Sequence, residues 1–143
     1  MKLPKKGSRL FSVEEANGLI PEVRTILHQL RKDQSTIEEL EKLQAVEELS
    51  WLSEDGTVSP AAEKALQALQ QKIEAATQAL KKGLGKFDTL GVQLKGLEEG
   101  LVDFFTARGD DVVFLCWKDG EEKISYWHDL ETGFTGRQPL ETL

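Results

Sequence analysis

The chain holds a single cysteine and no long hydrophobic run, and both shortages limit what it can be. One cysteine in 143 residues excludes an internal disulfide and fits a reducing cytoplasm. No apolar run approaches the roughly 18 residues that a membrane helix needs. The basic start MKLPKKGSRLF lacks the apolar segment of a secretory signal. We therefore expect one soluble cytoplasmic domain over residues 1–143, with no membrane partner.

Positive charge is scarce in the last third of the chain. Residues 91–143 carry 5 basic and 11 acidic side chains, whereas residues 1–90 carry 13 and 14. Nucleic-acid binding depends on Lys and Arg neutralising phosphates, so general nucleic-acid binding is excluded there. The remaining basic cluster is a short N-terminal arm that we interpret as a solvated terminus: Lys2, Lys5, Lys6 and Arg9.

The first long helix is predicted by a capping box. Ser12 and Glu15 are three residues apart, so each side chain can satisfy a backbone N–H of the other. Pro21 then falls inside the pattern, and we expect a short opening turn or a kink near Ile20. Apolar residues continue at helical spacing to about Ser50: Val23, Leu27, Leu30, Ile37 and Leu40.

A second helix is predicted after the turn-rich segment WLSEDGTVSP. Ser59 and Pro60 end that segment as a cap and first helical residue. A near-heptad seam follows: Ala62, Leu66, Leu69, Ile73, Ala76, Leu80, Leu84 and Phe87. The two helices form an antiparallel hairpin over residues 10–90 that leaves an apolar edge uncovered. We therefore expect a homodimer in which helices of two copies complete a bundle.

The spacing of apolar residues changes after the second helix, and the pattern of residues 91–143 predicts a small antiparallel β-sheet with an irregular tail. Short extended runs are expected near residues 92–95 and 101–105. VVFLCW and KISYW then flank KDGEE, whose central Asp-Gly favours a hairpin turn. The fold class is therefore α+β, a long helical hairpin packed with this sheet.

The register of that hairpin decides which chemical groups share a face. A two-residue loop at Asp119-Gly120 would put Cys116 and His128 on opposite faces of the sheet. A three-residue loop would put the same two residues on one face. The sequence leaves both registers open.

Cys116, His128 and Asp103 are candidate metal ligands by residue type. No second cysteine makes a CxxC pair, so the alternative is a buried thiol acting as a small hydrophobe beside a histidine that bonds a backbone group. A thiol hydrolase dyad is disfavoured. Cys116 lies in an apolar run and an acidic region, and both oppose a thiolate.

A small-ligand site at the C-terminal end is the other chemical hypothesis. Aromatic rings there offer flat apolar surface, and Arg137 offers a planar fork for a carboxylate or phosphate. The alternative is that the rings pack on the helices and Arg137 pairs with Asp129 or Glu131. The bonding partner of Asn17, protein or ligand, is open. The candidate ligand-binding residues are Glu14, Asn17, Asp103, Trp127, His128 and Arg137.

Four stretches of the chain carry a family resemblance: FSVEEANGLIPEVR, GLVDF, CWKDGE and YWHDLETGFTGRQPL. In this order they resemble an uncharacterised bacterial family, domain-of-unknown-function family 2203. The resemblance runs from about Leu10 to Leu140 and supports the architecture. It implies no activity, substrate or cofactor.

Two functions follow from these observations. The first is a self-associating interaction or structural module, because the helices are long and no motif is tied to a mechanism. The alternative is a small-ligand or metal-binding protein, or an enzyme, with its site in the C-terminal Cys/Trp/His/Arg cluster. That site is expected between the sheet and the start of the first helix. The identity of any cofactor is left open.

Overall fold

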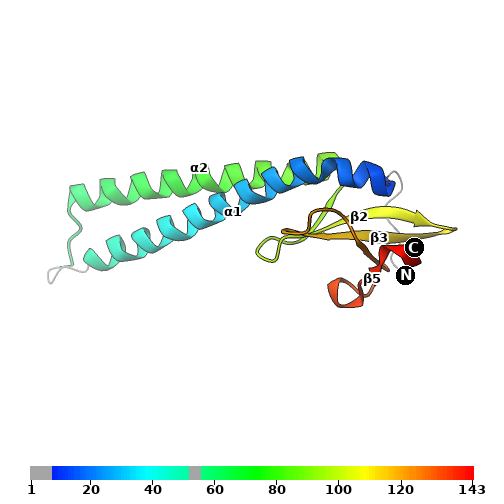
Figure 1. The fold of residues 1–143 in the computed structure, drawn as a ribbon. Coiled ribbons are helices and arrows are strands. Elements are labelled where there is room, and N and C mark those ends of the chain that lie inside the picture. The colour runs from blue at the N-terminus through cyan, green and yellow to red at the C-terminus, as the bar shows by residue number, and fades with distance from the viewer. Residues whose placement is uncertain (1–7, 52–55) are drawn as a thin grey trace. The chain divides into compact units, whose positions relative to one another are not determined.

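The computed structural model describes residues 8–51 and 56–143 and confirms the α+β class (Figure 1). The basic residues Lys2, Lys5 and Lys6 lie outside the described residues. The elements are α1 (Val13–Ser50), α2 (Pro60–Leu90), β1 (Gln93–Gly96), β2 (Leu101–Arg108), β3 (Asp111–Lys118), β4 (Tyr126–His128), the 3-10 helix η1 (Phe134–Gly136), β5 (Gln138–Pro139) and the 3-10 helix η2 (Leu140–Thr142).

The chain divides into two compact units. One contains the described residues up to His28 together with Gly85–Leu143, and the other is Gln29–Leu84. The first part of α1 and the end of α2 therefore belong to the same unit as the sheet. The second unit consists of the remaining lengths of the two helices.

Both helices begin where their caps predict. The Ser12 hydroxyl accepts a hydrogen bond from the Glu15 N–H at 3.1 Å, and the Glu15 carboxylate accepts one from the Ser12 N–H at 3.0 Å. At the second helix, the Ser59 hydroxyl accepts from the Ala62 N–H at 3.1 Å. The predicted separate opening turn is wrong, because α1 continues through Pro21.

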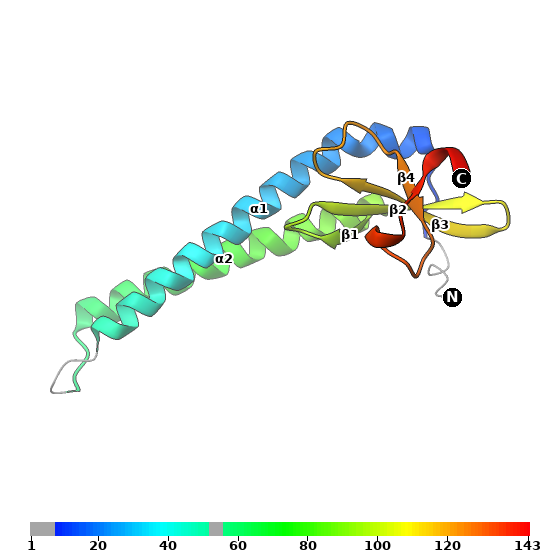
Figure 2. The same ribbon diagram turned by 60° about the horizontal axis from the view of Figure 1, so that its bottom comes forward.

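The sheet is antiparallel, and its strand order β1-β2-β3-β4-β5 follows the chain (Figure 2). The tight hairpin expected at Asp119-Gly120 is wrong. Residues 119–125 connect β3 to β4, and Cys116 pairs with Tyr126. The chain does turn at Asp119-Gly120, where Gly120 has a φ of 104°, but pairing begins only after the longer connection.

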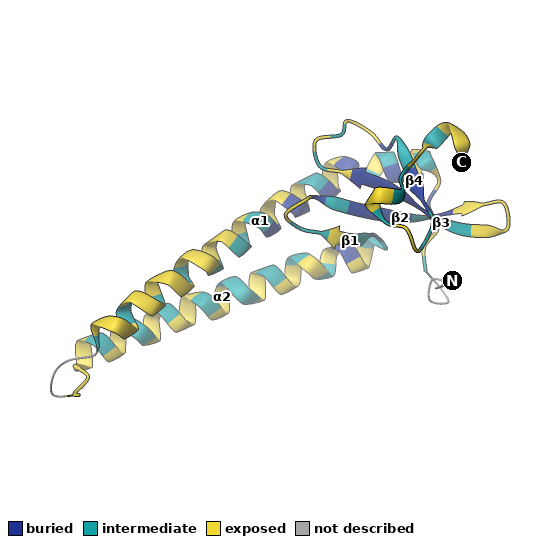
Figure 3. Ribbon diagram, turned by 90° about the horizontal axis from the view of Figure 1, so that it is seen from below, coloured by how far each residue is buried: buried dark blue, intermediate teal, exposed yellow. Residues whose placement is uncertain are grey.

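One face of the sheet packs against the first part of α1, which lies along it in both ribbon views (Figures 1 and 2). The apolar side chains on this face are fully buried: Val102, Phe104, Leu115 and Trp117. Their partners on the first part of α1 are also buried: Ala16, Ile20, Val23 and Leu27. This layer is the hydrophobic core of the first unit (Figure 3).

The opposite face of the sheet carries the residues that alternate with this core. Asp103, Cys116 and His128 point there, because neighbouring side chains on a strand point to opposite faces. Residues 129–136 cover this face, on the side of the sheet away from α1 (Figure 1). The covering segment buries three polar side chains that would otherwise face water.

The second unit is a helix pair with much of its surface exposed (Figure 3). The α2 seam residues that fall in it are half-buried, except for the exposed Leu84. On the last turns of α1, Leu43, Val46 and Leu49 are 55%, 64% and 68% exposed. Within the described residues, no helix is both long and apolar enough to cross a membrane.

Candidate functional site

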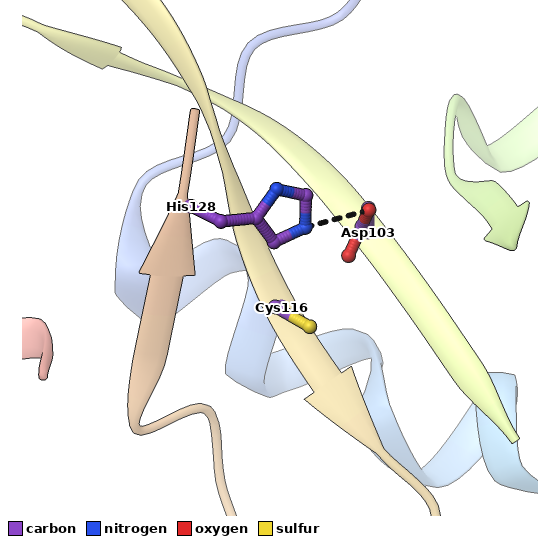
Figure 4. Close-up of side chains that lie close together, drawn as sticks. All are labelled: Asp103, Cys116 and His128. Atoms are coloured by element: carbon purple, nitrogen blue, oxygen red, sulfur yellow. Dashed lines mark hydrogen bonds and ion pairs between the residues drawn. The ribbon is translucent and has the colours of Figure 1, made fainter. Parts of the chain in front are cut away.

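Three strands bring one carboxylate, one thiol and one imidazole together (Figure 4). Asp103 is directly opposite Cys116 in the β2–β3 pairing, and His128 is two residues beyond the partner of Cys116 on β4. The ligand atoms of the three side chains all lie within 4.8 Å of one another. The residues are 1 to 2% exposed.

The hydrogen bonds of His128 fix its tautomer. Its Nδ1 lies 2.7 Å from the Asp129 carbonyl oxygen, which can only accept, so Nδ1 carries a hydrogen. Its Nε2 lies 2.9 Å from Asp103 Oδ2. A neutral ring would then direct the Nε2 lone pair at a carboxylate oxygen. The contact therefore requires a proton between the two atoms or a bound cation, and either one places a positive charge between the nitrogen and the oxygen.

The surroundings of His128 favour that positive charge. Burial acts to lower the pKa of His128, but the hydrogen bond and the negative charge of Asp103 outweigh it, so the pKa is raised. The hydrogen-bonding capacity of Asp103 is not fully satisfied, because its buried Oδ1 has no hydrogen-bond partner. One carboxylate oxygen therefore faces the imidazole, and the other can accept a hydrogen bond or bind an ion.

Cys116 is held as a neutral thiol. Burial, reinforced by the negative charge of Asp103, raises the pKa of Cys116 to about 12. Thiol nucleophiles need a lowered pKa, so the predicted objection to a Cys–His hydrolase dyad agrees with this environment. A metal ion would reverse the situation, because a coordinated thiol loses its proton.

A pocket of about 250 Å³ opens onto this cluster. Its floor is the three buried polar groups, and residues of β1, β2, β3 and the 129–136 segment surround them. Gly133 lies on the wall with a φ of 65°, a conformation that suits glycine. The lining residues are Lys95, Leu101, Asp103, Phe114, Cys116, His128, Leu130, Glu131, Gly133 and Phe134.

Arg137 is engaged beside the cluster and does not line the pocket. Its Nη2 donates to the Cys116 carbonyl at 3.3 Å and to the Glu121 carboxylate at 2.5 Å. Its guanidinium also lies 4.1 Å from the Tyr126 ring centroid and 4.8 Å from that of Phe134. The expected pairing with Asp129 or Glu131 is thus replaced by Glu121, because the longer β3–β4 connection brings Glu121 close.

Three other predicted ligand-binding residues lie elsewhere. Glu14 is exposed on the first turn of α1. Asn17 accepts a hydrogen bond from the Ile124 N–H at 2.8 Å, so its partner is the protein itself. Trp127 points to the α1 face of the sheet, and its Nε1 donates to the Thr142 hydroxyl at 2.9 Å. None of the three lines the pocket, because α1 packs on the other face.

The residues that sequence reasoning missed are mainly the pocket walls. Lys95 and Leu101 carry no motif, and only their positions on β1 and β2 place them here. The signal for Asp103 was visible, since one acid interrupts the apolar run LVDFF.

Comparison with known proteins gives a family and nothing further. A protein-family model described as "Uncharacterized conserved protein (DUF2203)" matches residues 9–140. No curated protein matches the chain significantly, and neither does any solved structure.

Proposed function

We propose a metal-binding function for this protein, which belongs to the DUF2203 family of uncharacterized conserved proteins. The ion is coordinated by the Asp103 carboxylate, the Cys116 thiolate and His128 Nε2. The family description assigns no activity, so the proposal rests on the site.

One observation carries the proposal: the contact between His128 Nε2 and Asp103 Oδ2 in a buried place beside a thiol. The Nδ1 hydrogen is held by a backbone carbonyl, which is the usual outer partner of a metal-bound histidine. The Nε2 atom, the Asp103 carboxylate and the Cys116 sulfur then lie within 4.8 Å of one another, and the second carboxylate oxygen, Oδ1, has no hydrogen-bond partner. A cation placed between them would satisfy all three.

The ligand types select the kind of ion. Thiolate and imidazole favour zinc and other late first-row metals, whereas magnesium and calcium prefer oxygen ligands. Zinc bonds of about 2.0 to 2.3 Å place tetrahedral ligands about 3.5 Å apart. The present separations, of 2.9 Å for nitrogen to oxygen and at most 4.8 Å overall, therefore need shifts of about 1 Å. Two anionic ligands neutralise a divalent ion.

The test is metal content measured by native mass spectrometry after loading with zinc and desalting. We expect one zinc ion per chain in the wild type and a loss of at least tenfold in affinity in Cys116→Ser and His128→Gln. Folding of each variant is checked in its metal-free form by circular dichroism. Cobalt loading gives a second readout, a thiolate-to-cobalt absorption band that Cys116→Ser abolishes.

The chain contains its own matched control. His28 Nε2 lies 2.9 Å from Asp119 Oδ2, the same separation as in the buried pair, with no cysteine in its surroundings to complete a site. His28→Gln should keep full zinc content. A folded His128→Gln variant that binds zinc as tightly as the wild type would overturn the proposal.

Self-association is the second candidate function, and the exposed Leu43, Val46 and Leu49 support it. These residues follow one another at intervals of three on α1, so they form a strip that a second copy can cover.

A bacterial cytoplasm is the location we propose, because a reducing compartment keeps Cys116 available as a thiol.

A further inference from the structure

The proposed metal site has one side that faces the pocket. Three protein groups coordinate the ion, whereas zinc takes four ligands. Within the described residues, the group of potential ligands that lie close together stops at Asp103, Cys116 and His128. Glu131, the other acidic residue of the pocket lining, is outside that group. The fourth ligand therefore has to enter from the pocket, as in zinc sites that bind a substrate.

A positive charge stands near the pocket opening. Lys95 is exposed on β1, and its Nζ lies 4.6 Å from the centroid of the Phe114 ring. The same ring packs at 5.3 Å against the imidazole of His128. Lys95 and His128 thus both contact the Phe114 ring. A negative group bound to the ion would be attracted by this ammonium.

The size and charge of the pocket exclude large or highly charged ligands. Its volume of about 250 Å³ is below the 300 to 1,000 Å³ usual for drug-sized molecules. Within the described residues, the lining contains no arginine, and the nearby Arg137 is already bonded to Cys116 and Glu121. Glu131 adds a negative charge to the rim, which disfavours a ligand carrying more than one negative charge.

The walls of the pocket are apolar. Leu101, Phe114 and Leu130 surround the floor, and Phe134 stands on the rim with 41% of its surface exposed. A short hydrocarbon chain placed among these residues would leave water, which strengthens binding by about fourfold for each buried methylene. A polar ligand of the same size would gain less.

We infer that the fourth metal position is taken by a small aliphatic monocarboxylate, whose carboxylate binds the ion near Lys95 and whose hydrocarbon chain lies against Leu101 and Leu130. This inference rests on the proposed metal site. It assigns to that site a ligand class and to Lys95 the role of attracting the ligand.

The test uses the full chain loaded with cobalt, whose visible bands respond to a change of ligand. Acetate and butyrate are titrated separately. We expect both to change the bands with saturation and butyrate to bind about tenfold more tightly, since it has two more methylenes. Lys95→Gln should weaken butyrate binding about fivefold. Lys86→Gln, which removes an exposed lysine of α2, should leave it unchanged.

The outcomes separate the two proposals. In one outcome the thiolate-to-cobalt band is present while butyrate leaves the visible cobalt bands unchanged. That result would support the metal site and overturn the ligand inference. Equal weakening by Lys95→Gln and Lys86→Gln would overturn the role of Lys95. If the thiolate-to-cobalt band is absent in the folded wild type, both proposals fail.

Discussion

Two histidine–aspartate pairs in this molecule have the same 2.9 Å separation and very different surroundings. His28 is half exposed, so its pair with Asp119 is screened by water and contributes little to stability. The side chains of His128 and Asp103 are only 2% and 3% exposed. Buried charges are costly unless they are fully paired, and the unpartnered Oδ1 of Asp103 leaves this pairing incomplete. Residue identity alone does not distinguish the two pairs, whereas the degree of burial does.

The thiol of Cys116 makes metal uptake depend on pH. Its pKa is raised to about 12, so the metal-free thiol is protonated at neutral pH and must lose its proton to coordinate. We expect zinc affinity to rise with pH, by about tenfold per pH unit for this proton, through the neutral range. Proton release, measured by calorimetry in buffers of different ionisation enthalpy, checks this.

The control for proton release is Cys116→Ser. If this folded variant still binds zinc, its binding should release about one proton fewer, because a hydroxyl ligand stays protonated at these pH values. Unchanged proton release in Cys116→Ser would show that the thiol does not coordinate the ion.

The start of α1 is tied to the sheet unit by hydrogen bonds as well as by its apolar face. The Thr106 hydroxyl donates to the Phe11 carbonyl at 2.7 Å, and the Phe11 N–H donates to the Phe105 carbonyl at 2.7 Å. Asn17 accepts from the Ile124 N–H in the β3–β4 connection. The Asn17 contact holds the connection that precedes β4, and β4 carries His128.

Asn17→Ala should therefore destabilise the sheet unit. The substitution removes the acceptor and leaves the part-buried Ile124 N–H without its partner, at a cost of about 2 kcal/mol in the free energy of unfolding. Urea denaturation measures the change. Asn17→Asp keeps an oxygen acceptor at the same position and should lose less than half as much. Equal losses in the two variants would mean that the hydrogen bond is not the cause.

At the level of elements, the sequence predicted the helices better than the strand register. Local capping at Ser12 and Ser59 fixes the helix starts, and such signals are visible without any tertiary contact. The β3–β4 register depends instead on contacts of Glu121, whose carbonyl accepts from Trp117 Nε1 and whose carboxylate accepts from the Lys118 N–H. Those contacts hold residues 119–125 as a long connection that an Asp-Gly signal does not reveal.

The candidate site was partly predictable from the sequence, because residue types are visible in it and the packing of α1 on the sheet is not. Asp103, Cys116 and His128 could be chosen by residue type, since few polar groups interrupt the apolar strands. Their grouping with Glu14 and Asn17 could not be judged, because it depends on which face of the sheet α1 covers, whereas Trp127 could have been separated from His128. Alternation along β4 alone sends Trp127 and His128 to opposite faces.

At the scale of the whole molecule, the oligomeric state remains a prediction. We expect a dimer whose dissociation constant rises at least tenfold when Leu43, Val46 and Leu49 are all replaced by Gln. The reason is the loss of apolar surface that a second copy would cover. Sedimentation equilibrium over a range of concentrations measures this constant.

A matched polar variant shows whether the apolar strip is responsible. Glu41→Gln with Glu48→Gln alters exposed residues in the same stretch of α1 and should leave the dissociation constant within about twofold. A wild type that stays monomeric at high concentration would contradict the dimer and leave the proposed metal site unaffected.

The order in which the first unit's segments occur along the chain has a consequence for translation. Ile20, Val23 and Leu27 leave the ribosome early, whereas the strands of the sheet that packs on them begin only at Gln93. During the interval the apolar face of α1 has no sheet to pack against. This stretch is therefore the part of the nascent chain with the greatest need of a chaperone until β3 has emerged.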